Sequence, residues 1–105
     1  MNGITVHLGM VIRSVRHKGL RRLLADNDPR FVNSDLVARV RRILTVLVLA
    51  EDIESFAADA PRSWRFHRLT GDRRDVWSVS VSGNWRMTFN EVDGYIDRLN
   101  LEDYH

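Results

Sequence analysis

The sequence lacks cysteine and has no apolar segment long enough to cross a bilayer. The absence of cysteine excludes disulfide bonds and thiolate metal sites, so the chain depends on its hydrophobic core and on any partner for stability. The most apolar stretch, residues 43–50, is far shorter than the roughly 20 residues that a transmembrane helix needs. Residues 1–9 contain neither a basic start nor a long apolar run, so no signal peptide is apparent and we expect a cytoplasmic protein.

Lysine is also nearly absent, because Lys18 is the one lysine among 16 basic residues and the others are arginine. The planar fork of arginine suits bidentate contacts with phosphate and stacking on bases, which favours an RNA or DNA ligand. A GC-rich genome would produce the same bias whatever the function. Composition therefore favours nucleic acid only slightly.

The chain is 105 residues long and 44% apolar, which suits one globular domain over residues 1–105. Met10 opens a segment that resembles a natural beginning, so residues 1–9 are interpreted as a possible N-terminal extension.

The region from Val76 to His105 alternates apolar and polar residues, which predicts a meander of three antiparallel strands. Ser82-Gly83-Asn84 forms the first predicted turn, and the Asp93-Gly94 pair forms the second, before a strand over residues 95–101. The tryptophans, valines, Met87 and Phe89 fall on one face of this meander. Arg86 falls on the opposite, polar face, where we expect the function.

Upstream periodicity predicts a strand, two helices and another strand. Their approximate positions are a strand over 10–15, a helix from near Gly19 to 26, a helix capped by Asn33 or Ser34 and running to 50, and a strand over 64–69. The acidic segment 51–56 either continues or follows the second helix. The order β-α-α-β-β-β-β predicts an α+β fold of two layers, a small twisted, mostly antiparallel sheet packed by two antiparallel helices.

Specific segments carry a family resemblance: IRSVRHKGLRRL near the start, FHRLTGDRRDVWSVSVSGNWRMTF in the middle and LEDYH at the end. Together they strongly resemble HigB-type toxins, the plasmid maintenance system killer branch of the RelE-like superfamily, from about Met10 to His105. The resemblance implies an endoribonuclease that cleaves mRNA, in many members only in the ribosomal A site. It also implies a HigA-like helix-turn-helix antitoxin as partner, with operator DNA bound only through the toxin–antitoxin complex. The family fold agrees with the order of elements read above.

RNA cleavage without a metal uses the neighbouring 2′-hydroxyl as nucleophile and needs a base, a cation at the phosphorane and an acid. Arg86 matches the arginine of the family's strand motif, and its fork fits two phosphate oxygens. The alternative role for Arg86 is a salt bridge with Asp97 or Glu91. No cofactor is expected, and the sequence has neither an HxxxH motif nor a carboxylate cluster that would suggest a metal site.

His67 and His105 match the family's catalytic histidines, and imidazole titrates near neutral pH. Which of them is the base and which is the acid stays open. Asp103 either orients a histidine or acts as the base itself. Tyr104 either stacks on a base or donates a hydrogen bond to phosphate.

Where family members often have a lysine, this chain offers Arg68, Arg73 and Arg74 for RNA binding, so the second cation is undecided. Adjacent residues of a strand point to opposite faces, so His67 and Arg68 are not expected to line one flat site together. The alternative function is a non-catalytic binding module, a decayed toxin that acts within a DNA-binding toxin–antitoxin repressor complex.

Overall fold

A computed structural model describes residues 9–104. The possible extension over residues 1–9 therefore lies almost wholly outside the described residues, as does His105. In chain order the elements are β1 (Val11–Ile12), α1 (Lys18–Asp26), α2 (Val37–Leu49), α3 (Ile53–Asp59), η1 (Arg62–Trp64), β2 (His67–Arg68), η2 (Gly71–Arg73), β3 (Trp77–Ser82), β4 (Trp85–Val92) and β5 (Tyr95–Asp103). No helix in this part of the chain is long and apolar enough to span a membrane.

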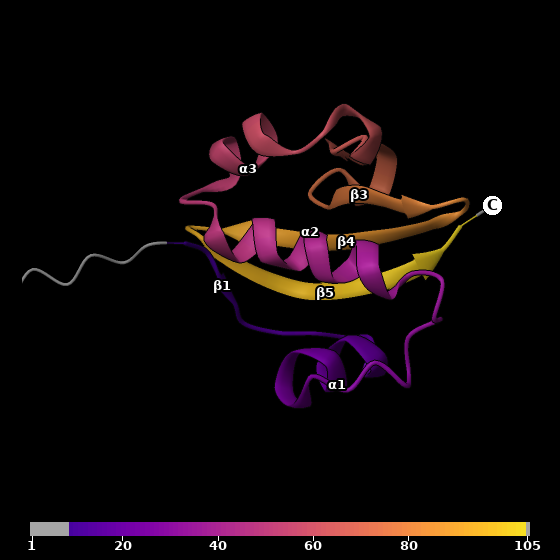
Figure 1. Ribbon diagram of the computed structural model, residues 1–105. Coiled ribbons are helices and arrows are strands. Elements are labelled where there is room, and N and C mark those ends of the chain that lie inside the picture. Colours follow the sequence, from indigo (N-terminus) through magenta and orange to yellow (C-terminus); the bar gives the residue numbers. More distant parts are fainter. Residues whose placement is uncertain (1–8, 105) are drawn as a thin grey trace, which may run out of the picture.

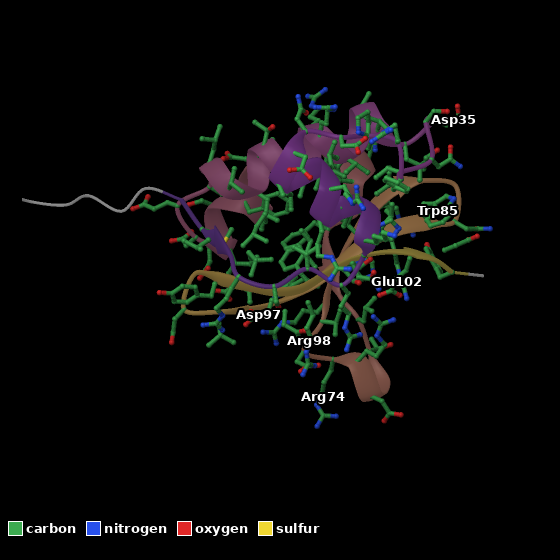
Figure 2. All side chains as sticks on the ribbon, turned by 90° about the horizontal axis from the view of Figure 1, so that it is seen from below. Asp35, Arg74, Trp85, Asp97, Arg98 and Glu102 are labelled. Atoms are coloured by element: carbon green, nitrogen blue, oxygen red, sulfur yellow. The ribbon has the colours of Figure 1, made fainter. Side chains whose placement is uncertain are left out.

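The five strands form one mixed sheet in the order β1-β5-β4-β3-β2. β1 runs parallel to β5, and all other neighbours are antiparallel. Two views at right angles place α2 across one face of the sheet and leave the other face free of the main helices (Figures 1 and 2). The α+β class, the layered arrangement and the mostly antiparallel sheet are thus confirmed.

The core lies between α2 and the apolar face of the meander. The predicted stripe of α2 is buried, with Val40, Ile43 and Leu47 fully inaccessible to solvent. Across from it, Val79 and Met87 are also fully buried, as the period-two pattern predicts. Burial of the face that carries these side chains leaves the polar side chains of β3, β4 and β5 on the opposite face.

Residues 9–104 contain three α-helices, one more than the sequence predicts. The acidic segment forms α3, which Asp52 caps by accepting a hydrogen bond from the backbone N–H of Ser55 at 2.8 Å. Phe56 of α3 packs against Trp64, with ring centroids 6.3 Å apart, and both side chains are buried. This packing holds Trp64 in η1, so the strand predicted over 64–69 shortens to the two residues of β2.

The first helix is capped by His17, whose Nδ1 accepts a hydrogen bond from the backbone N–H of Leu20 at 3.1 Å. Gly19 allows a close approach, because a Cβ there would lie 2.1 Å from the carbonyl oxygen of Phe31. The predicted cap of the second helix is wrong. Asn33 instead accepts from the backbone N–H of Asp35 at 3.0 Å, which makes a local turn, and α2 begins later, at Val37.

A β-bulge interrupts the pairing of β4 with β5. Thr88 pairs with Asn100, whereas Asn90 pairs with Asp97, so β5 carries one extra residue between these pairs. Within this bulge Arg98 adopts a left-handed conformation with φ of 53°. Bulges bend a strand and redirect its side chains, and they are frequent beside active sites.

Candidate active site

The polar face of the sheet carries a row of functional groups from three strands. Ser80 of β3, Arg86 of β4 and Glu102 of β5 are register partners, and directly paired residues share one face. Figure 2 shows Arg74 and Arg98 on the side of the sheet away from the helices. The polar face thus brings together charged and polar side chains from all three strands of the meander.

Arg86 is held firmly and still has unused donors. Its side chain is 16% exposed, and Nη2 lies 3.5 Å from Oε1 of Glu102. The guanidinium carbon lies 4.2 Å from the ring centroid of Tyr104, a cation–π contact. Nε is buried and has no hydrogen-bond partner within residues 9–104. Unsatisfied buried donors are rare and cost about 1–3 kcal/mol each, so this one points to a ligand-binding role.

Glu102 connects Arg86 to a second arginine. Both of its oxygens accept hydrogen bonds from Arg73, at 3.0 and 2.7 Å, and Thr88 donates a further one through its hydroxyl. The hydrogen bonds from Arg73, above all, lower the pKa of Glu102 from 4.5 to about 2. One ionised carboxylate therefore places Arg73, from the η2 segment, beside Arg86.

The salt-bridge alternative for Arg86 named Asp97 or Glu91, and neither is its partner. Asp97 is paired with Arg13, and a side-chain oxygen of Glu91 accepts from the backbone N–H of Gly94 at 2.8 Å. Arg86 does form an ion pair, but its partner is Glu102. Glu102 is shared with Arg73, and its contact with Arg86 is made by Nη2. This ion pair therefore occupies only part of the N–H donors of Arg86.

The end of β5 lies against the β3–β4 turn. The backbone N–H of Tyr104 donates to the carbonyl oxygen of Asn84 at 2.9 Å, which brings the Tyr104 ring onto Arg86. Asp103 pairs in register with Trp85, so its position belongs to the face opposite Arg86. His105, the remaining residue of the predicted trio, lies outside the described residues.

His67 lies on the same face as Arg86, in the neighbouring row of the sheet. It pairs with Ser78, which pairs in turn with Thr88. Nδ1 of His67 lies 2.5 Å from the carbonyl oxygen of Arg65. Because a carbonyl only accepts, Nδ1 carries the proton, and Nε2 remains available for proton transfer.

The three candidate RNA-binding arginines separate. Arg68 pairs with Trp77 and holds its guanidinium 4.9 Å from that ring, so it lies on the face opposite His67, as the strand alternation predicts. Arg74 is exposed on the segment after η2. Arg73 is the one of these three that contacts the Arg86–Glu102 pair.

Glu102 and Thr88 are the residues that sequence reasoning missed. The alternation of β5 contained the signal, since Glu102 and Tyr104 are two residues apart and share a face, whereas Asp103 between them does not. Within the described residues no group of three or more histidine, aspartate and glutamate side chains gathers closely enough to hold a metal ion.

Comparisons with known proteins identify the family of the chain. The profile of a family described as "RelE-like toxin of type II toxin-antitoxin system HigB" matches residues 13–105. A curated relative named Endoribonuclease HigB, from Proteus vulgaris, is 35% identical over 95 residues, which cover 90% of this chain and 100% of the relative. The family match extends over β2 to β5 and the C-terminal segment, which build the polar face. The chain therefore belongs to the HigB-like family of RelE-like toxins of type II toxin–antitoxin systems.

Proposed function

We propose that this toxin is an endoribonuclease that cleaves mRNA in the ribosomal A site, by metal-independent attack of the 2′-hydroxyl on the adjacent phosphate. Family membership and the name of the Proteus vulgaris relative support the ribonuclease activity. The observation that carries the chemistry is Arg86, a nearly buried guanidinium whose Nε lacks a hydrogen-bond partner within residues 9–104.

In the proposed reaction the 2′-oxygen forms a bond to phosphorus while the bond to the 5′-oxygen breaks. The products are a 2′,3′-cyclic phosphate and a 5′-hydroxyl. Arg86 binds the non-bridging phosphate oxygens and stabilises the charge that develops on them. Arg73 supplies the second cation, because Glu102 holds it beside Arg86.

Two protons must move, one away from the 2′-oxygen and one onto the 5′-oxygen. His67, through Nε2, and His105 are the proposed pair, and their order is left open. Of the two roles expected for Asp103, orienting His105 is the one retained in the proposal, because the register puts Asp103 on the face opposite Arg86. Tyr104 positions the guanidinium of Arg86 with its ring face, and its 43% exposure leaves the ring edge available to a nucleotide.

The proposed partners follow from the family. A HigA-like helix-turn-helix antitoxin binds the toxin, and the complex binds operator DNA through the antitoxin. The ribosome presents the mRNA in the cytoplasm.

Expression from a tightly repressed promoter tests this proposal. The native chain is expected to arrest growth and to produce new mRNA 5′ ends in frame with codons. Arg86→Ala should abolish both effects, whereas Arg42→Ala, which removes the same charge from an exposed position on α2, should retain them. Soluble native protein without arrest and without new ends would refute the proposal and favour the non-catalytic repressor module.

A further inference from the structure

A hollow of about 280 Å³ opens on the polar face beside the candidate active site. It lies between β4, β5, the segment 72–76 and the segment that joins β1 to α1. Thr88 and Glu102 form part of its wall, so the hollow adjoins the carboxylate that holds Arg73 and Arg86. Its volume is near the lower end of the roughly 300–1,000 Å³ range of small-molecule pockets, which suits one nucleotide unit.

Two arginines line this hollow, and one of them, Arg98, interacts with Asp97 only through its charge, which helps to lower the pKa of that carboxyl. Neither the Arg16 nor the Arg98 side chain forms a hydrogen bond or an ion pair within residues 9–104. Asp97, adjacent to Arg98, is already held by two hydrogen bonds from Arg13. The guanidinium groups of Arg16 and Arg98 are therefore available for a phosphate.

A β-bulge in the backbone directs Arg98 to the wall of the hollow. The β4–β5 bulge places Arg98 at φ of 53°, a left-handed conformation that is unfavourable for residues other than glycine and asparagine. The backbone N–H of Arg98 donates to the hydroxyl of Ser14 at 2.8 Å, which fixes the bulge. Such strained positions cluster at functional sites, and a bulge redirects a side chain.

The remaining wall suits a nucleoside better than a bare anion. Asn100 has no side-chain hydrogen bond within the described residues, so its amide offers both donors and an acceptor. Asn90 donates to the carbonyl oxygen of Asp75 at 3.2 Å, which leaves its own carbonyl oxygen as an acceptor. Asp72 and Asp75 also line the hollow. They disfavour a bare anion but accept hydrogen bonds from base amino groups and ribose hydroxyls.

We propose that this hollow is a second RNA subsite, which binds the nucleotide next to the scissile phosphate. Arg16 and Arg98 bind its phosphate, and Asn100 contacts its base or ribose. The inference rests on the proposed function, because an RNA strand must lie on Arg86 for its neighbour to enter the hollow.

Equilibrium binding of the full chain to 2′-O-methyl RNA, which lacks the attacking hydroxyl, tests the subsite by fluorescence anisotropy. A dinucleotide offers one internal phosphate, whereas a tetranucleotide offers further phosphates to the hollow. The test variant is Arg16→Ala/Arg98→Asn, since asparagine tolerates the left-handed conformation. The matched control is Arg21→Ala/Arg42→Ala, which removes the same charge from exposed helix positions.

The test variant is expected to bind the tetranucleotide about 10-fold more weakly than the native chain and the dinucleotide equally well. The plot of log affinity against log salt should become shallower, its negative slope losing about 0.7 in magnitude, which is the value for one lost single-strand phosphate contact. The control should match the native chain in both measurements. Any one of four results would overturn the subsite. They are native affinity in the test variant, an equal loss of affinity in the control, no binding of the tetranucleotide by the native chain, and loss of antitoxin binding instead of RNA binding.

Failure of the subsite and failure of the proposed function give different results. If Arg86-dependent cleavage occurs in cells and the test variant binds RNA as the native chain does, the subsite is refuted and the ribonuclease stands. If no cleavage occurs but the test variant selectively loses tetranucleotide affinity, the hollow binds RNA and the proposed reaction is refuted.

Discussion

Replacing Glu102 by glutamine tests how the two arginines are held on the polar face. Glutamine keeps the size of the side chain and one acceptor oxygen for Thr88, but it removes the charge that faces Arg73 and Arg86. The pKa of this carboxyl is lowered from 4.5 to about 2, mainly by the hydrogen bonds from Arg73. At about 1.4 kcal/mol per pKa unit, the full shift corresponds to about 3 kcal/mol.

Water reduces this value, because the side chains of Glu102 and Arg73 are 19% and 44% exposed. We therefore expect Glu102→Gln to lower the free energy of unfolding by about 1–2 kcal/mol at pH 7. A lowered pKa means that the unfolded state binds the proton first as the pH falls. The stabilisation is thus complete above pH 4.5 and is lost as the pH falls toward about 2.

Urea denaturation of both proteins between pH 7 and pH 3 measures this difference. The difference in unfolding free energy should decrease steadily below pH 4.5, because the protonated native side chain becomes equivalent to glutamine. Glu51→Gln is the control, since Glu51 is exposed and forms no ion pair within residues 9–104. A difference that stays constant with pH, or a Glu102→Gln protein as stable as the native chain at pH 7, would refute the reasoning.

Two further predictions concern Tyr104 and Gly19. Tyr104→Phe should keep most of the cleavage rate because the ring face still contacts Arg86, whereas Tyr104→Ala should lower the rate about 10-fold, within the usual range of a cation–π contact. Equal losses in both variants, measured by single-turnover cleavage, would show that the hydroxyl matters more than the ring. Gly19→Ala should destabilise the protein by about 1–3 kcal/mol in urea denaturation, because the new Cβ would lie 2.1 Å from the Phe31 carbonyl oxygen. A more stable Gly19→Ala protein would mean that this contact relaxes and that helix propensity, worth about 1 kcal/mol, decides the outcome.

Local patterns were sufficient to predict the central part of the site. The alternation of side chains along a strand depends on neighbouring residues alone, so it predicts that Arg86 lies on the polar face and that His67 and Arg68 lie on opposite faces. Both placements are present in the structure. The roles of the histidines and of Asp103 stay predictions.

Long-range packing decided the features that the sequence did not reveal. The partner of Arg86 depends on which strand of the sheet lies beside β4, and the register selects Glu102. Trp64 leaves its predicted strand because its indole packs against Phe56. The start of α2 was mispredicted because Asn33 has two local uses, a helix cap or a turn, and only the tertiary structure selects between them.

The central claim is that Arg86 stabilises the cleavage transition state, and a single-turnover rate on mRNA-programmed ribosomes tests it most directly. Arg86→Ala should cleave about 10²–10³-fold more slowly than the native chain, while its affinity for the ribosome is unchanged. Arg86→Lys should recover only part of the rate, because lysine cannot form a bidentate contact with phosphate. An Arg86→Ala protein that binds the ribosome and cleaves at the native rate would contradict the account.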